Sequence, residues 1–397
     1  MTLRPTTFAL LILPFVLPIA LSFDLYLSSV PTMPEALAVK PSQIQLTLSV
    51  FLYCFALGQL LIGPASDRFG RRKTLLFSLI LFTSGSIFCA LAPNFALLLT
   101  GRVLQAFGAC GSQVIGLALV RDNCEGKDVT KIISFVRAGA AISPIMAPIL
   151  GAYLQVNYGW QANFVVLSLY GISIFFLAWN FIEDTVQEKS PGSFLHHYIN
   201  SFKSVLSHIS FIYFAACAMA AQAVVFGYFS LAPRYYMRHF DLTESQFALL
   251  FSLNSCLFLL TGILGGKFII QYLGCRRTTW MAAIILILSG VVMYAANYFY
   301  SHHFALFLPY LMASTGTALM GAASAAGAMM PFKQKAGTAS ALFGCVEFMG
   351  GCLLGTLASK HVLHSVLPYA SWIILLGGSI IAVNILFNRT LANKITS

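Results

Sequence analysis

The chain has 397 residues, of which 58% are hydrophobic and only 9% are charged. Soluble proteins carry about 25% charged residues, so this composition excludes an ordinary soluble enzyme or binding domain and predicts an integral membrane protein. The formal net charge is +11, but the basic residues fall in short clusters between apolar runs, which fits membrane topology better than nucleic-acid binding. We therefore expect a lipid bilayer around the protein and no nucleic-acid partner.

The apolar runs have the length of membrane-spanning helices, which need about 20 residues each. Charged residues and Pro and Gly clusters divide them into twelve segments, and most of the linkers between them are only a few residues long. In chain order the segments lie near 8–30, 44–66, 74–92, 95–120, 131–155, 160–182, 209–231, 245–271, 278–297, 304–330, 337–359 and 366–388.

One linker is longer than the others. Charged residues and a Ser-Pro-Gly turn interrupt the hydrophobicity over 183–208. We therefore predict an all-α integral membrane fold with an N-terminal six-helix bundle over 1–183, a cytoplasmic linker over 184–208 and a C-terminal six-helix bundle over 209–397. Most Lys and Arg residues fall on one side of the predicted spans, and the positive-inside rule assigns that side, with both termini, to the cytoplasm.

The two halves also resemble each other weakly under a shift of 204 positions, which brings two basic loops of the same predicted topology together. This indicates a parallel repeat of two six-helix units. The glycines that coincide are Gly58 with Gly262, Gly70 with Gly274 and Gly151 with Gly355.

The loop after the second segment combines glycines with an acid and several bases. It contains Gly58, Asp67, Arg68, Gly70 and Arg71. Gly70 permits a tight turn, and the acid can pair with the bases or with a helix end. This arrangement resembles the signature loop of the major facilitator superfamily of membrane transporters. The resemblance implies a cytoplasmic contact that opens and closes during transport, so we assign these five residues to conformational gating.

Three further segments are similar to the proton-coupled drug exporters of that superfamily. Arg102 and Gln105 in the fourth segment match an R-x-x-Q-G pattern, with Ala106 where a glycine is usual. The run from Asp24 to Pro31 is similar to the D-x-Y-L-x-x-x-P of the bicyclomycin-resistance (Bcr/CflA) subfamily. The fifth segment resembles the antiporter motif of these exporters, which adds four gating residues: Gly139, Pro144, Pro148 and Gly151.

Asp24, Arg102 and Glu347 lie within predicted spans, where a charge costs several kcal/mol unless it is paired or hydrated. Asp24 and Arg102 are at comparable depths in helices that line the central cavity of the resembled fold, so we expect them to interact directly or through water. Glu347 is near the middle of its span, where the subfamily has an uncharged amide. We predict that these three residues couple protons. The alternatives are a structural partner or a near-surface position for Asp24, snorkelling or bonds to backbone carbonyls for Arg102, and a structural role for Glu347.

Aromatic and polar residues in several spans are suited to a cavity for a flat apolar ligand, although packing and lipid contact are the alternative for each aromatic residue. The predicted cavity residues are Tyr26, Gln105, Gln222, Phe226, Tyr228, Phe229 and Asn254.

We expect no metal and no other cofactor. The nine cysteines are scattered without a C-x-x-C pair, so neither a disulfide framework nor a zinc site is indicated. Two His pairs lack acidic or Cys companions, and no phosphate-binding loop is present. The driving force is then an ion gradient rather than a nucleotide.

The sequence thus predicts a monomeric, proton-coupled secondary transporter of the bacterial inner membrane that works by alternating access. The Bcr/CflA resemblance implies that it exports drug-like or lipophilic small molecules. A dedicated transporter of one metabolite, such as a siderophore, an amino acid or a nucleoside, is the alternative. A polytopic membrane enzyme is the alternative from another class, and it is not favoured because the sequence contains no recognisable buried nucleophile–base or metal cluster.

Overall fold

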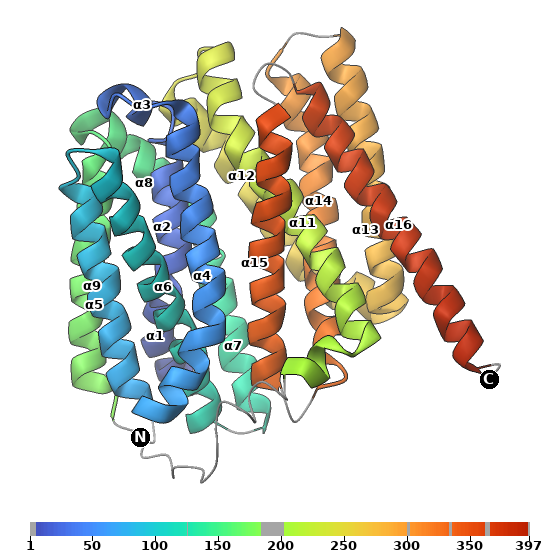
Figure 1. The fold of residues 1–397 in the computed structure, drawn as a ribbon, viewed down its shortest axis with the longest axis horizontal. Coiled ribbons are helices and arrows are strands. Elements are labelled where there is room, and N and C mark those ends of the chain that lie inside the picture. The colour runs from blue at the N-terminus through green and yellow to red at the C-terminus, as the bar shows by residue number, and fades with distance from the viewer. Residues whose placement is uncertain are drawn as a thin grey trace. The chain divides into compact units, whose positions relative to one another are not determined.

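The computed structural model describes residues 5–124, 126–183, 202–299, 302–332, 336–361 and 366–395, and these ranges are helical without a β-strand. Residues 184–201 of the predicted linker lie outside the described residues. Figure 1 shows the helices in chain order. In the first half they are α1 (Pro5–Val16), α2 (Pro18–Leu27), α3 (Met33–Ala36), α4 (Pro41–Phe69), α5 (Arg71–Ala90), α6 (Phe95–Asn123), α7 (Gly126–Ala140), α8 (Ser143–Tyr158) and α9 (Gln161–Phe181).

The second half is also helical. Two short π-helical turns, η1 and η2, follow α11 and α12 directly. The elements are α11 (Ile209–Arg234), η1 (Tyr235–His239), α12 (Glu244–Leu264), η2 (Gly265–Ile269), α13 (Ile270–Phe299), α14 (Phe304–Met329), α15 (Ala336–His361) and α16 (Leu367–Ile395).

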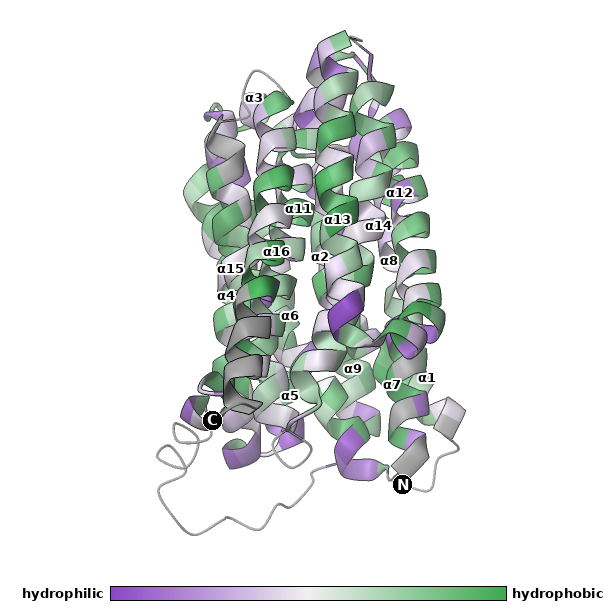
Figure 2. Cartoon of the chain, turned by 90° about the vertical axis from the view of Figure 1, so that its right-hand side faces the viewer, coloured by the Kyte–Doolittle hydropathy of each residue, from purple (hydrophilic) through white to green (hydrophobic). Residues whose placement is uncertain are grey.

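Among the described residues, ten helices are long and apolar enough to cross a membrane, or eleven if the bent pair α1 and α2 counts as one span. Figure 2 shows the apolar residues along these helices. One of the ten runs for 56 residues, from Glu244 to Phe299, and includes both predicted segments 245–271 and 278–297. At about 1.5 Å per residue it is more than twice as long as a ~30 Å hydrocarbon core. The total of twelve spans and the cytoplasmic termini stay predictions.

Contacts within the chain divide it into two compact units. The first consists of Met1–Gly192 with Leu242–Ser252, and the second of Ser193–Asp241 with Leu253–Ser397. The start of α12 therefore clusters with the first unit, which the sequence analysis did not expect. The division into two six-helix bundles stays a prediction.

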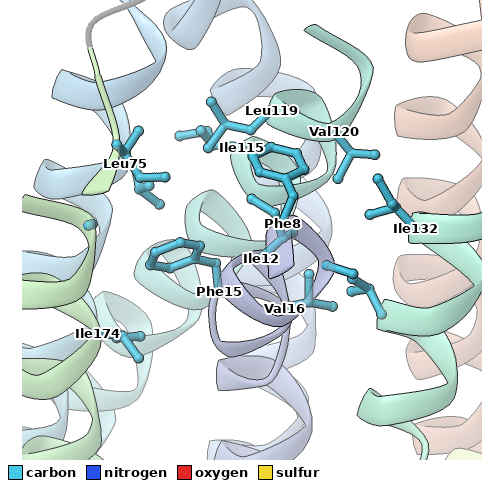
Figure 3. Close-up of a cluster of buried hydrophobic side chains, with 14 of the residues drawn as sticks. Phe8, Ile12, Phe15, Val16, Leu75, Ile115, Leu119, Val120, Ile132 and Ile174 are labelled. Atoms are coloured by element: carbon cyan, nitrogen blue, oxygen red, sulfur yellow. The ribbon is translucent and has the colours of Figure 1, made fainter. Parts of the chain in front are cut away.

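The core of the first unit surrounds α1. Phe8, Ile12, Phe15 and Val16 are buried and belong to one cluster of apolar side chains. Figure 3 shows the side chains of α1 among residues from α5, α6, α7 and α9. The labelled partners are Leu75, Ile115, Leu119, Val120, Ile132 and Ile174.

Two of the predicted spans are interrupted, which the sequence analysis did not anticipate. The first bends by 47° between α1 and α2, where Pro18 begins the second helix. The fifth is broken at 141–142, between α7 and α8, and Pro144 follows at the second position of α8. Proline lacks an N–H and fits the first turn of a helix better than its interior. α1 packs on α7, and α2 packs on α8. Each half of the first predicted span therefore packs against one half of the fifth.

The predicted repeat recurs in local geometry. Gly70 and Gly274 both have a positive φ, of 95° and 77°, where a glycine is favoured. Four residues after each glycine, Thr74 and Thr278 donate hydrogen bonds to the glycine carbonyl, at 2.9 and 2.8 Å. The two halves correspond in a third feature, a bond from a basic residue of the loop to the last helix of the same half. Arg72 donates to the Trp179 carbonyl at 2.7 Å, and Arg276 donates to the Asn384 carbonyl at 3.3 Å.

Close packing of α5 on α6 leads to a prediction about stability. A Cβ atom at Gly85 would lie 2.6 Å from the Gly101 carbonyl oxygen and 2.9 Å from Gln105 Cα. We expect Gly85→Ala to destabilise the protein by about 1–3 kcal/mol, the usual range for overpacking. The measurement is the melting temperature of the purified protein in detergent. Gly262→Ala on α12 is the control, because its Cβ meets nothing within 4 Å and alanine favours a helix. Equal melting temperatures for the two variants would contradict the packing seen here.

Candidate functional site

Asp24 is a buried carboxyl group in the first unit. Its residue lies on α2 and is 5% exposed, and its Oδ2 accepts a hydrogen bond of 3.1 Å from Ser143 Oγ. Ser143 is the first residue of α8, which begins after the break at 141–142. The interruption therefore places the first residue of α8 against Asp24, and its hydroxyl, as a hydrogen-bond donor, favours a negative charge on the carboxyl group.

Arg102 is fully buried on α6 and is held by other groups than Asp24. Its Nη1 donates to the Ser22 carbonyl at 3.1 Å and to Gln105 Oε1 at 2.7 Å. The guanidinium carbon lies 4.5 Å from the ring centroid of Tyr26 and 4.4 Å from that of Phe51, within the range of cation–π contacts. Arg102 thus bonds a backbone carbonyl, which was the alternative to a contact with Asp24, and it also bonds the side chain of Gln105.

The expected direct contact between Asp24 and Arg102 is not formed. The described ion pairs do not include this pair. Arg102 reaches α2 at Ser22, two residues before Asp24, and residues two apart on a helix do not face the same way. Within the described residues, Arg102 Nε and Nη2 have no hydrogen-bond partner.

Two predicted cavity residues of the first unit take part in the same polar network. The Tyr26 hydroxyl lies 2.7 Å from Thr47 Oγ1 on α4, and Gln105 Nε2 donates to Ser86 Oγ on α5 at 2.9 Å. Both residues are fully buried. These bonds tie α2, α4, α5 and α6 together around Arg102, and a contact of Tyr26 or Gln105 with substrate stays a prediction.

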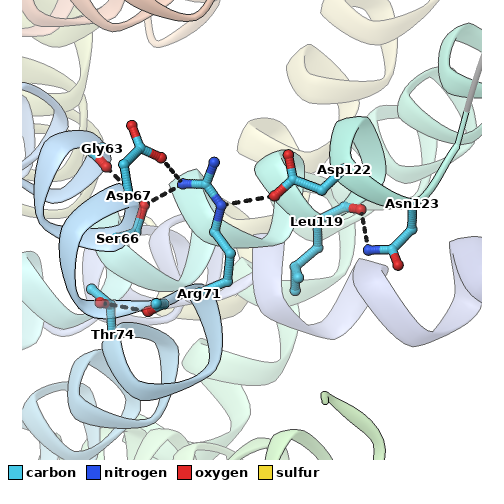
Figure 4. Close-up of polar contacts among 9 residues, drawn as sticks. Gly63, Ser66, Asp67, Arg71, Thr74, Leu119, Asp122 and Asn123 are labelled. Atoms are coloured by element: carbon cyan, nitrogen blue, oxygen red, sulfur yellow. Dashed lines mark hydrogen bonds and ion pairs between the residues drawn. The ribbon is translucent and has the colours of Figure 1, made fainter. Parts of the chain in front are cut away.

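The predicted gating loop forms an ion-pair cluster at the ends of three helices (Figure 4). Arg71 Nη1 lies 2.5 Å from Asp67 Oδ1, and Arg71 Nε lies 2.8 Å from Asp122 Oδ2. Ser66 Oγ accepts a further hydrogen bond from Arg71 Nη1. Because Asp67 lies in the last turn of α4, Arg71 begins α5 and Asp122 is close to the end of α6, one arginine links three helices. We call Asp67, Arg71 and Asp122 the acid–base cluster.

The sequence analysis missed Asp122. It comes from a different span than the motif, so spacing along the chain does not associate it with Asp67. A usable signal was present, because an acid directly after Arg121 ends a predicted span on the same predicted side as the loop. Arg68, in contrast, does not join the cluster's described contacts, and its guanidinium carbon lies 5.4 Å from the ring of Phe69.

Several predicted gating residues are sites of close helix packing. A Cβ at Gly58 would lie 2.9 Å from Cys110 Sγ on α6, one at Gly139 would lie 2.8 Å from Leu13 Cδ1 on α1, and one at Gly151 would lie 3.0 Å from Leu25 Cα on α2. Pro144 is in the first turn of α8, and Pro148 lies inside that helix. The three glycines allow close approach between helices, and the two prolines follow the break between α7 and α8.

The predicted residues of the second unit lie on three helices. On α11, Phe226 and Tyr228 are buried and Gln222 and Phe229 are half-buried. The Tyr228 ring stacks on Tyr310 with 3.5 Å between centroids and 7° between planes. The remaining two are Asn254 on α12, which is 6% exposed, and Glu347 on α15, which is half-buried.

Comparison with known proteins gives one consistent result. The sequence profile of the Major Facilitator Superfamily matches residues 12–355. The chain is 32% identical over 362 residues to a chloramphenicol resistance protein of Pseudomonas aeruginosa, covering 90% of this chain and 84% of that protein. It is 25% identical over 354 residues to the multidrug resistance protein MdtL of Escherichia coli O81 (strain ED1a), covering 89% and 87%. The crystal structure of a POT family transporter in complex with 5-aminolevulinic acid has the same fold, with a TM-score of 0.80 at 14% identity over 99% of this chain and 97% of that one.

Proposed function

The chain belongs to the major facilitator superfamily, and from this premise we propose that it is a proton-coupled secondary transporter that exports drug-like or lipophilic small molecules. Members of this family are multi-pass membrane transporters rather than enzymes. Export is supported by the drug-resistance relatives, whose names state resistance to chloramphenicol and to multiple drugs. The proposal places the protein, as a monomer, in a bacterial inner membrane.

The observation that carries the proposal is the position of Asp24. It is a buried carboxyl group on α2, which together with α1 is apolar enough to cross a membrane, and its described partner, Ser143, is uncharged. An ionisable group at such depth is costly and is usually retained for function. Burial favours the protonated form, whereas the hydrogen bond from the Ser143 hydroxyl favours the ionised form. A small shift of α8 relative to α2 would therefore change the balance, which is what proton coupling requires.

The remaining predicted residues have supporting roles in this proposal. Arg102 and Glu347 take part in proton coupling, the first by fixing the backbone of α2 beside Asp24. The substrate contacts Tyr26 and Gln105 in the first unit and Gln222, Phe226, Tyr228, Phe229 and Asn254 in the second. The acid–base cluster and the glycines and prolines described above control the change between the two access states.

Transport by the purified full-length protein in proteoliposomes tests this function. With an acidic interior and a neutral exterior, an antiporter accumulates its substrate inside. We expect accumulation of chloramphenicol or of lipophilic cations from a panel that also contains amino acids, nucleosides and siderophores. Abolition by a proton ionophore would establish the coupling. Transport of one metabolite alone would support a dedicated metabolite transporter and overturn the proposal.

Glu347 leads to a prediction about substrate charge. A half-buried carboxylate in a membrane helix is a natural contact for a lipophilic cation. We therefore expect Glu347→Gln to reduce the transport of cationic substrates at least fivefold and to leave neutral substrates within twofold. Transport rates for ethidium and chloramphenicol measure this difference. Glu183→Gln, which changes an exposed acid after α9, is the control. An unchanged ratio of the two rates would limit Glu347 to a structural role.

A further inference from the structure

A series of polar contacts follows one side of α2 from Asp24 and continues beyond the end of this helix to Thr32. We refer to residues 24–32 as the segment. Carboxyl and hydroxyl groups of this segment meet hydroxyl, carbonyl and amide groups on α8 and α9. We call the four pairs the α2 seam: Asp24 with Ser143, at 3.1 Å; Ser28 with the Pro148 carbonyl, at 3.2 Å; Ser29 with Asn163, at 2.8 Å; and Thr32 with Gln155, at 3.0 Å.

Three of the seam residues lie along one face of a backbone that stays helical or turned from Asp24 to Thr32. Asp24, Ser28 and Thr32 are four residues apart, which is the spacing of one helical face. The backbone keeps turning after α2 ends, because Ser29 N–H donates to the Tyr26 carbonyl and Thr32 N–H to the Ser29 carbonyl. At about 1.5–2.0 Å per residue, the eight residues from Asp24 to Thr32 span roughly 12–16 Å.

The seam leads from the buried interior to a more accessible end. Asp24 is 5% exposed, and Ser28, Ser29 and Asn163 are completely buried. Thr32 and Gln155 are half-buried. Thr32 directly precedes α3, which lies at the end of the first unit opposite the chain's N-terminus (Figure 1). Polar side chains thus occur at intervals between a buried carboxyl group and the edge of the unit.

The seam also contains acceptors that lack donors. Within the described part of the chain, Asn163 Oδ1 and Gln155 Oε1 are buried without a hydrogen-bond partner. Pro148 has no N–H to donate to the Pro144 carbonyl four residues earlier. Inside a membrane such groups are satisfied by protein or by water, and buried water usually binds polar groups that have no other partner. Water molecules between the pairs would also bridge the ~6 Å steps along α2.

We propose that the α2 seam is the route by which protons reach Asp24 from the end of the unit next to α3. This inference rests on the proposed proton-coupled function. A proton enters at Thr32 and Gln155, and each hydroxyl or water on the way accepts one proton and passes another on. The last proton binds the Asp24 carboxylate, which becomes a neutral carboxylic acid. When the access state changes, the acid releases its proton to water on the other side, so that one proton crosses for each one that enters.

The charged groups around α2 do not compete for this role. α2 packs against α1, α6, α8 and α9, and it meets α4 through the Tyr26–Thr47 contact. α1 has no titratable side chain, Arg102 is held at Ser22 and Gln105, and Asp122 is held by Arg71. The titratable residues of the other four helices are Tyr53, Cys54, Asp67, Arg68, Arg102, Cys110, Arg121, Asp122, Tyr153, Tyr158 and Tyr170.

The test separates proton-driven accumulation from exchange, since exchange of labelled for unlabelled substrate at equal pH needs no net proton movement. We would reconstitute the full chain and use radiolabelled chloramphenicol as the probe. Asn163→Leu replaces a seam amide by an apolar side chain of similar size, and Thr32→Val does the same at the accessible end. We expect accumulation driven by an acidic interior to slow at least tenfold in Asn163→Leu and at least threefold in Thr32→Val. Exchange should stay within twofold of wild type.

Ser168→Ala is the matched control, because Ser168 is a buried hydroxyl on α9 that donates to Phe164 of its own helix. It should leave both rates within twofold. Accumulation that is undiminished in both seam variants would overturn the proposal. So would equal losses of accumulation and exchange, because the seam would then only hold helices together. A wild-type protein that exchanges chloramphenicol without accumulating it would instead refute the proton coupling on which the seam depends.

Discussion

Asp24→Asn is expected to abolish accumulation against a gradient while leaving substrate exchange within about threefold of wild type. The substitution keeps the size of the side chain and an acceptor for Ser143 Oγ, so the local packing of α2 on α8 is retained. It removes the group that binds and releases the proton. Proteoliposomes with and without a pH gradient measure the two activities on the same preparation.

Binding as a function of pH provides a second measurement of the same variant. If a proton and substrate compete at Asp24, wild-type affinity weakens as the pH falls, because protonation removes the charge that substrate binding requires. Asp24→Asn should bind with an affinity that is nearly independent of pH. Accumulation by Asp24→Asn at the wild-type level, with unchanged pH dependence of binding, would transfer the coupling role to another residue, with Glu347 as the first candidate.

Ser143→Ala is the companion variant, because it removes the hydroxyl donor and leaves the Asp24 carboxylate. Its binding should still depend on pH, but with a displaced midpoint. The two variants separate the roles of the two residues. A variant whose binding no longer depends on pH has lost the group that titrates. A variant whose midpoint is displaced has lost a group that shifts the pKa of the titrating group.

The burial of Asp24 could be predicted from the sequence, but its environment could not. An acid within an apolar run of about 20 residues must be buried in a span, and the structure places it on α2 at 5% exposure. Its partner depends on a break in the fifth span, at 141–142, which hydrophobicity does not reveal because apolar residues continue through it. The proline that permits the break, Pro144, was recognised only as part of a motif.

Arg102 illustrates a second limit. Opposite charges at similar depths suggest an ion pair, but depth does not give rotation about the helix axis. In the structure the guanidinium faces Gln105, three residues on along the same helix, and the rings of Tyr26 and Phe51. Rotation is fixed by packing between segments far apart in the sequence, such as α2 on α6, and a single sequence contains no direct record of it.

Local geometry within short motifs was more accessible. The positive φ of Gly70 and Gly274 follows from the tight turn that each basic loop requires, and both are found. The contact between Asp122 and Arg71 could not be predicted in this way. It joins the start of α5 to the end of α6, so that the whole α5–α6 hairpin lies between the two residues in the sequence. It became visible only when the helices were placed together.

The acid–base cluster leads to the last prediction. Asp67→Asn is expected to reduce transport at least tenfold and to change ligand affinity by no more than about threefold. The physical reason is that Arg71 holds the ends of α4, α5 and α6 in one arrangement, so removing an acid changes the equilibrium between access states. Transport rates and equilibrium binding on the same purified protein measure the two effects. Equal losses of rate and affinity would indicate general damage instead.

Asp122→Asn should have a similar effect, because Asp67 and Asp122 act on the same arginine. Residues that share a partner are not expected to be additive, so the double variant should transport no more than about threefold more slowly than the worse single variant. Asp128→Asn is the matched control, since Asp128 pairs with Lys131 at 3.5 Å in an exposed i,i+3 contact within one helix, a type worth little. If the effects of Asp67→Asn and Asp122→Asn multiply in the double variant, the two acids act independently and Arg71 is not the link between the three helices.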